Sequence, residues 1–242
     1  PIVLDLCWGS ATAFSEKVFK FLGANLTVIN GIADGTKINL GCGSTNLKQL
    51  KNTVVEKKAQ MGFAFDGDAD RMIAIDEHGR VVNGDHILYL WGSYLKERNL
   101  LTSNRLVATM MSNLGFENAW VLNGGIIDRT PVGDQYVHNA MVATKADLGG
   151  EQSGHILSTI NGLCGDGLLT ALHMSCISKK CDIRLSEWLD QSFIPYPQKL
   201  INVPLNSTTS RKHWESSKAF QDIIIEAKVA LGDEGRVLIR ES

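Results

Sequence analysis

The sequence predicts an α/β protein: two consecutive α/β domains with mixed, mainly parallel sheets, followed by a truncated α+β C-terminal domain. Short runs rich in β-branched residues alternate with amphipathic stretches of helical length, which is the pattern of βαβ units. The 242 residues are 44% hydrophobic, enough for one large or two modest cores. A polar stretch at 97–104 and the prolines Pro195 and Pro197 interrupt the alternation. We therefore expect domains over 1–98, 99–195 and 196–242.

The first domain is predicted to alternate strands and helices around one acidic loop. Strands are expected at 2–6, 26–29, 61–65, 72–75 and 80–82, and helices at 13–22, 47–59 and 85–97. A long polar loop over 30–44 precedes the second helix, which we expect Ser44 or Thr45 to cap.

The second domain is predicted to repeat this plan. Strands are expected at 105–110, 126–128 and 155–159, with helices at 114–121, 133–142 and from Gly-Asp-Gly at 165–167 to about 178. Ser186 is expected to cap a short helix. The tail from Lys199 is predicted as strand, helix (about 211–231) and strand.

Composition argues against several classes of protein. A net charge of −2 provides no long-range attraction for nucleic acid or a membrane surface. Five scattered cysteines without CxxC spacing favour neither a disulfide framework nor a zinc site, so a reducing cytoplasm is the expected location. No run approaches the roughly 18 apolar residues of a membrane span, and no signal peptide opens the chain.

The loop Asp-Gly-Asp-Ala-Asp-Arg at 66–71 carries the clearest functional signal. Because small residues separate its carboxylates, Asp66, Asp68 and Asp70 can converge on one point between two apolar strands. Converging carboxylates repel unless a cation joins them, and hard oxygen ligands favour Mg²⁺. Arg71 suggests that an anion such as a phosphate completes the site.

Other interpretations of this loop can be tested against its spacing. An EF-hand is excluded because Arg71 stands where that loop needs glycine, and because strands flank the loop where helices should. A solvated acidic turn and a two-carboxylate phosphatase of another fold remain open.

The glycine-rich loop Gly-Gly-Glu-Gln-Ser-Gly-His at 149–155 is the second candidate. Its carboxylate, amide, hydroxyl and imidazole groups could hydrogen-bond neighbouring sugar hydroxyls. A polar turn between helix and strand is an equally good explanation of this loop alone. His155 by itself is most simply a surface histidine.

Taken together, these motifs resemble the α-D-phosphohexomutase superfamily, and within it the branch that acts on glucosamine phosphates. The matching segments span almost the whole chain: 34–39, 42–45, 66–71, 82–89, 111–115, 132–137, 150–155 and 165–167. The acidic loop and the glycine-rich loop together are highly specific. The branch acting on mannose and glucose phosphates is the alternative.

The resemblance implies a reaction and a set of roles. In this superfamily a phosphoserine donates its phosphoryl group to a hexose monophosphate, the bisphosphate intermediate turns over, and the other phosphate returns to the serine. The implied reaction interconverts glucosamine 6-phosphate and glucosamine 1-phosphate for cell-wall sugar nucleotides. The resemblance implies that Asp66, Asp68 and Asp70 bind Mg²⁺. It implies that Arg71 and His155 are catalytic residues. The residues implied to bind the substrate are Glu151, Ser153, Arg240 and Ser242.

The chain departs from the superfamily pattern at both ends. The nucleophile motif Thr-x-Ser-His-Asn is absent, and the phosphate-loop motif stops at Ser242. Gln135 replaces an arginine that many relatives carry. We therefore expect a fragment that does not turn over by itself, and a non-catalytic sugar-phosphate or metal-binding module is the alternative of another class.

Overall fold

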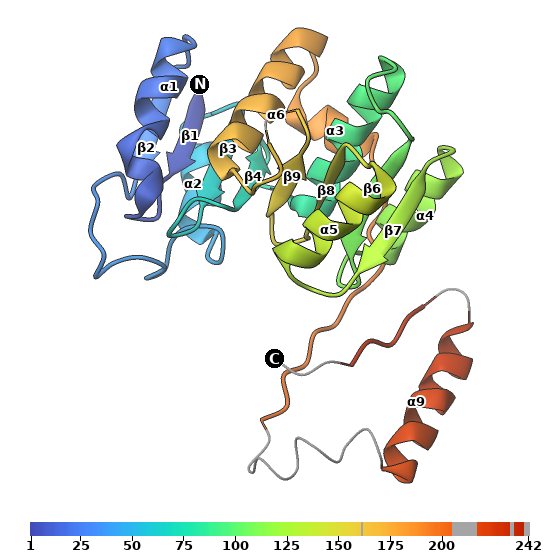
Figure 1. The fold of residues 1–242 in the computed structure, drawn as a ribbon. Coiled ribbons are helices and arrows are strands. Elements are labelled where there is room, and N and C mark those ends of the chain that lie inside the picture. The colour runs from blue at the N-terminus through green and yellow to red at the C-terminus, as the bar shows by residue number, and fades with distance from the viewer. Residues whose placement is uncertain (161, 205–216, 233–234, 240–242) are drawn as a thin grey trace. The chain divides into compact units, whose positions relative to one another are not determined.

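The computed structural model describes residues 1–160, 162–204, 217–232 and 235–239 (Figure 1). The chain divides into two compact units, Pro1–Ile194 and Pro195–Ser242. The first unit contains two mixed sheets with helices on both faces, as the α/β prediction requires.

The first sheet has five strands in the order β2-β1-β3-β4-β5. Parallel pairing joins β1 (Ile2–Asp5) to β2 (Leu26–Ile29) and to β3 (Met61–Phe65). Antiparallel pairing joins β3 to β4 (Met72–Asp76), and β4 to β5 (Val81–Val82). In the β3–β4 register Phe65 pairs with Met72, so residues 66–71 form the connection between two fully buried strands.

The second sheet has four strands in the order β7-β6-β8-β9. Here β6 (Arg105–Thr109) pairs in parallel with β7 (Ile126–Thr130) and with β8 (Leu148–Gly150). The last strand, β9 (Ile156–Ser158), runs antiparallel to β8. Gly150 pairs with Ile156, so residues 151–155 form a hairpin loop.

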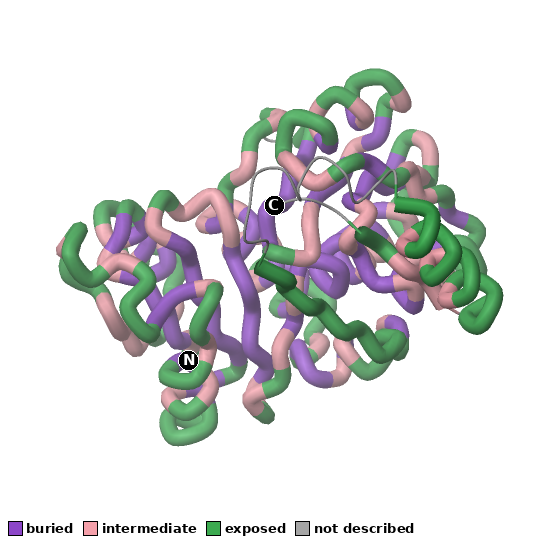
Figure 2. Tube along the Cα trace, turned by 90° about the horizontal axis from the view of Figure 1, so that it is seen from below, coloured by how far each residue is buried: buried purple, intermediate pink, exposed green. Residues whose placement is uncertain are grey.

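Helices cover both faces of each sheet. On one face, α2 (Lys48–Glu56) packs on the first sheet and α5 (Asp134–Thr144) on the second. The opposite faces share one apolar cluster, built with α1 (Ser15–Phe21), α3 (Gly84–Glu97), α4 (Leu114–Leu122), α6 (Gly167–Cys181) and α7 (Leu185–Asp190). Figure 2 shows buried segments in the interior with exposed segments around them. The shared cluster joins the two sheets into one unit.

Several local predictions were wrong for identifiable reasons. Neither Ser44 nor Thr45 caps α2, whose N-cap is Leu47 without a side-chain hydrogen bond. Ser186 lies inside α7, because Arg184 occupies the N-cap position. The first predicted helix is confirmed as α1, and a 3-10 turn, η1 (Ser10–Ala13), precedes it.

The second unit has one regular element among the residues that the structure describes. Helix α9 (Lys218–Leu231) has no buried residue, and the strands predicted on either side of it are not formed within 199–204 or 235–239. A strand without a partner has no ladder of hydrogen bonds to stabilise it.

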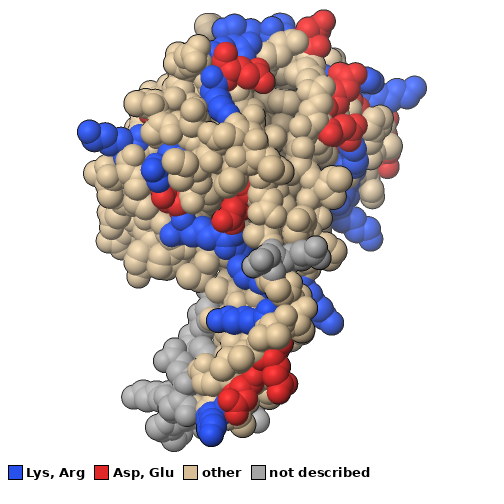
Figure 3. Space-filling model, turned by 90° about the vertical axis from the view of Figure 1, so that its right-hand side faces the viewer, with Lys and Arg blue, Asp and Glu red and all other residues tan. Residues whose placement is uncertain are grey.

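Neither the charge distribution on one face nor the helices of the described residues resemble those of a protein with membrane-spanning helices. On the face shown in Figure 3, acidic and basic side chains are interspersed. No helix within the described ranges is long and apolar enough to cross a membrane.

Candidate functional site

The acidic loop at 66–71 is held in a tight reversal between β3 and β4. Ala69 adopts a left-handed conformation (φ 65°), which lets the loop turn back toward β4. The Ser10 amide donates to the Gly67 carbonyl at 2.9 Å. A Cβ atom on Gly67 would lie 2.7 Å from the Ile38 side chain, so glycine is needed where the 30–44 loop packs on this turn.

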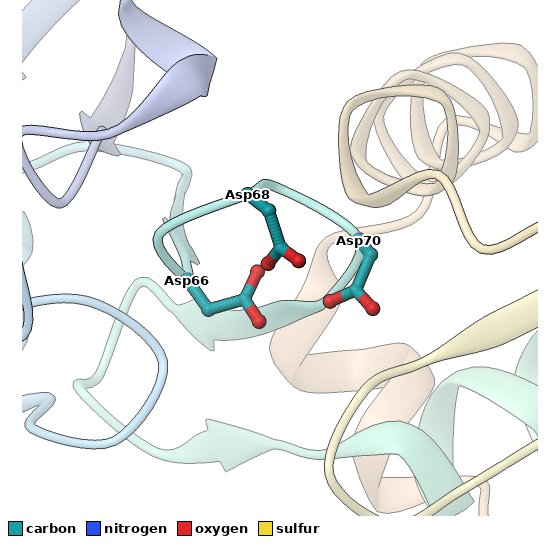
Figure 4. Close-up of side chains that lie close together, drawn as sticks. All are labelled: Asp66, Asp68 and Asp70. Carbon is teal, nitrogen blue, oxygen red and sulfur yellow. The ribbon is translucent and has the colours of Figure 1, made fainter. Parts of the chain in front are cut away.

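The three aspartates converge as predicted. Asp66, Asp68 and Asp70 each offer an oxygen, and these three oxygens lie within 4.8 Å of one another (Figure 4). Asp66 is buried, Asp70 is half-buried and Asp68 is exposed. One side of the cluster is therefore set in the protein and the other is open to a ligand.

Arg71 is the cation nearest to this cluster in the described structure. Its Nε atom lies 3.1 Å from Asp66 Oδ2 and 3.4 Å from Asp70 Oδ1, and its amide donates to Asp66 Oδ1 at 3.1 Å. Burial and the adjacent Asp70 carboxyl nevertheless raise the pKa of Asp66 to about 7. Asp70 Oδ1 is buried and accepts no hydrogen bond from the described residues. One arginine thus does not neutralise the negative charge of the three carboxylates. Their oxygens are suitable ligands for a hard cation.

His155 brings the glycine-rich loop to the acidic loop. Its Nδ1 atom lies 3.0 Å from Asp70 Oδ2, and Arg71 and His155 form an isolated antiparallel bridge. The His155 side chain is 9% exposed, and a Cβ atom on Gly165 would lie 2.3 Å from its ring. His155 is therefore a buried residue of the site. The interpretation of His155 as a surface histidine is wrong.

Glu151 and Ser153 lie on the same hairpin loop as His155. Glu151 is half-buried: its Oε1 accepts from the Gly133 amide at 2.9 Å, and its Oε2 accepts from the Ser153 hydroxyl at 3.1 Å. Ser153 is exposed. The loop thus presents an oriented carboxylate beside a hydroxyl, whereas Arg240 and Ser242 lie outside the described residues.

One buried carboxylate near the site was not singled out by the sequence reasoning. Asp5 is fully buried and accepts from the amides of Cys7 at 3.1 Å and Gly43 at 2.8 Å, and from the Asn30 side chain at 2.8 Å. It anchors the 30–44 loop that packs on Gly67. The available signal was an aspartate inside the apolar strand 2–6, because a charge buried there needs partners.

Family comparisons cover both sheets. The family model described as phosphoglucomutase/phosphomannomutase, alpha/beta/alpha domain II, matches residues 1–79. The corresponding domain III model matches residues 83–196.

Curated relatives with similar sequences share one name. The chain is 62% identical over 242 residues to a phosphoglucosamine mutase of Prochlorococcus marinus, covering 100% of this chain and 52% of that protein. It is 59% identical to a phosphoglucosamine mutase of Parasynechococcus marenigrum, again with 100% and 52% coverage. The chain thus spans about half the length of the curated relatives it matches.

Solved structures show the same fold. An N-acetylglucosamine-phosphate mutase of the α-D-phosphohexomutase superfamily matches with a TM-score of 0.75 at 19% identity, covering 100% of this chain and 55% of that one. A phosphoglucomutase/phosphomannomutase family protein from Burkholderia thailandensis matches with a TM-score of 0.64 at 27% identity, covering 72% and 38%. The chain belongs to the phosphohexomutase family and carries its domains II and III.

Proposed function

We propose that the protein is a phosphoglucosamine mutase, interconverting glucosamine 6-phosphate and glucosamine 1-phosphate through a bisphosphorylated sugar. One observation carries the proposal: the acidic loop contacts the glycine-rich loop, with Asp70 Oδ2 3.0 Å from His155 Nδ1. The 62% identity to a phosphoglucosamine mutase supports the choice of sugar.

The proposed role of the acidic loop is to hold Mg²⁺ through Asp66, Asp68 and Asp70. The chemistry that Mg²⁺ would supply there is neutralisation of charge on the oxygens of the transferred phosphoryl group. Arg71, already bound to two of these carboxylates, adds a second positive group beside that phosphate. The resemblance implies that the phosphoryl donor is a phosphoserine outside the two matched domains.

The proposed role of the glycine-rich loop is to bind and orient the sugar. Glu151 and Ser153 would hydrogen-bond neighbouring hydroxyls, as their paired oxygens favour. His155, held by Asp70 through Nδ1, would orient the sugar or move a proton at its other ring nitrogen. A cytoplasmic location is part of this proposal, since all five cysteines are free thiols.

Activity of the full-length gene product tests this proposal. Purified enzyme should give a kcat/KM for glucosamine phosphates at least about tenfold above that for mannose or glucose phosphates, a difference of about 1.4 kcal/mol in transition-state binding. The reverse preference would favour a phosphomannomutase/phosphoglucomutase. No turnover of any of these sugars, with Mg²⁺ or sugar phosphate still bound, would favour a non-catalytic binding module.

A further inference from the structure

The hairpin loop at 151–155 depends on support from outside itself. Internally, the Glu151 amide donates to the His155 carbonyl and the Gly154 amide donates to the Glu151 carbonyl, both at 3.0 Å. These bonds close the turn but do not fix it to the protein. A loop that must present two oxygens to a sugar needs such fixing, because misplacement by about 1 Å can lower the rate by about a hundredfold.

Two neighbours hold the loop by its backbone. At the acidic-loop side, the Met72 amide donates to the Gly154 carbonyl at 3.1 Å. At the opposite side, the Gly84 amide donates to the Gln152 carbonyl at 3.0 Å. A Cβ atom on Gly84 would lie 1.9 Å from the Glu151 carbonyl oxygen, so only glycine allows the first turn of α3 to approach this closely.

The next residue of α3, Asp85, adds the side-chain contact. Asp85 is fully buried, and its Oδ2 atom accepts from the Gln152 side-chain amide at 3.0 Å and from the Asn113 backbone amide at 2.8 Å. Asn113 in turn caps α4 by accepting from the Gly115 amide at 2.9 Å. One carboxylate therefore ties three segments together: the start of α3, the start of α4 and the glycine-rich loop.

We propose that Asp85 is a positioning residue for sugar binding, acting through Gln152 to set the loop that carries Glu151 and Ser153. The inference rests on the proposed function of those two residues. A carboxylate is suited to this position because its Oδ2 atom can accept hydrogen bonds from the Gln152 side chain and the Asn113 amide at the same time. Burying a carboxylate is unfavourable unless hydrogen-bond donors surround it, and here two of the donors come from the glycine-rich loop and the start of α4. The competing explanation is that Asp85 only stabilises the N-terminus of α3.

Hydrogen exchange in the full-length protein tests positioning independently of activity. In Asp85→Asn, the Glu151 and Gly154 amides should exchange about tenfold faster or more, because the loop opens more often. The matched control is Asp76→Asn, since Asp76 is equally buried and accepts from backbone amides and the Arg80 side chain. This control should leave exchange in the loop unchanged. Unchanged exchange in Asp85→Asn would overturn the inference.

Steady-state kinetics test whether Asp85 acts through the glycine-rich loop. Asp85→Asn should lower kcat/KM by about tenfold to a hundredfold, mainly through a higher KM, while the Mg²⁺ concentration for half-activation stays within about twofold. Combined with Glu151→Ala, it should add little further loss, because both changes disable the same contact. A fully additive loss, or an equal loss in Asp76→Asn, would overturn the inference.

A second variant covers the case in which Asp85→Asn does not fold. Gln152→Leu removes the same hydrogen bond from a half-buried position on the loop and should show the same exchange and KM effects. If neither effect appears in that variant, the inference is wrong. If the wild-type protein has no mutase activity, the proposed function fails, while the exchange measurement still decides whether Asp85 positions the loop.

Discussion

Asp68 is the exposed member of the acidic cluster, so its substitution tests metal binding with little effect on packing. Asp68→Asn should weaken Mg²⁺ binding by roughly tenfold to a hundredfold, because it removes one of three ligand charges. Titration calorimetry on the full-length protein measures this directly. Asp34→Asn is the control, since this half-buried carboxylate bonds Thr36 and Lys37 and lies outside the cluster. Equal affinity of the Asp68→Asn variant and the wild type would refute the metal assignment.

Substitution of Glu151 tests whether the glycine-rich loop binds the sugar. Its carboxylate is oriented by Gly133 and Ser153, so Glu151→Ala should lower kcat/KM for glucosamine 6-phosphate by about tenfold to a thousandfold. Steady-state kinetics on the full-length enzyme provide the measurement. Glu187→Gln, which alters an exposed carboxylate paired with Arg184, should have no effect on kcat/KM. Unchanged kinetics in Glu151→Ala would remove the sugar role of this loop.

At the scale of elements, apolar periodicity was informative where strands are buried and failed where glycine dominates. Strands β3 and β4 lie where the apolar runs predicted them, because all of their residues are buried. Strand β8 was missed: Leu148, Gly149 and Gly150 resemble a loop, yet β6 and β9 flank them. That strand exists because of partners distant in the sequence. A Cβ atom on Gly149 would lie 2.8 Å from Met141 Sδ, which explains the glycine.

The first turn of α3 should make stability sensitive to acid. Burial lowers the pKa of His86 to about 4 from 6.5, and its ring stacks on Phe193 at 4.5 Å. Between these two pH values the unfolded chain binds a proton that the folded chain does not, so stability is complete above pH 6.5 and falls toward pH 4. The loss should approach about 3 kcal/mol. Urea unfolding at a series of pH values measures it.

A substitution assigns this pH dependence to His86. His86→Gln should flatten the slope of unfolding free energy between pH 6.5 and 4, even though it lowers stability at neutral pH. His138→Gln, which changes a histidine on α5 that lies outside the buried core, should leave the slope as in the wild type. A slope that survives His86→Gln would assign the acid sensitivity to other groups.

At the scale of the whole molecule, the site exists only because two distant loops meet. The Asp66–Arg71 turn connects strands of the first sheet, and the 151–155 loop connects strands of the second. Each loop could be predicted from its own residues. Their contact through Arg71 and His155 could not be derived from local pattern, because it depends on how the two sheets pack around their shared cluster. The resemblance to a known family implied only that the two loops serve one active centre.

Arg80 joins the end of β4 to α7. Its guanidinium binds the fully buried Asp76 at 2.6 Å, Asp190 of α7 at 2.5 Å and the Ser186 carbonyl at 3.0 Å. Removing it leaves a buried carboxylate without its charge partner and unties the turn after β4 from α7. Because Arg80 is 41% exposed, the expected loss is discounted to about 1–3 kcal/mol in Arg80→Ala.

Chemical unfolding of the full-length protein, monitored by tryptophan fluorescence, measures this loss. Trp188 is a suitable probe because it lies on α7 between Ser186 and Asp190, the two residues of that helix that Arg80 contacts. Lys20→Ala is the control: it breaks an exposed ion pair with Glu16 within one helix and should change stability by less than about 0.5 kcal/mol. We expect Arg80→Ala to lower the unfolding midpoint while the two sheets still unfold together, since their apolar cluster remains. An Arg80→Ala midpoint equal to that of Lys20→Ala would mean that the Arg80 contacts add no stability to that of the apolar cluster, which joins the two sheets without them.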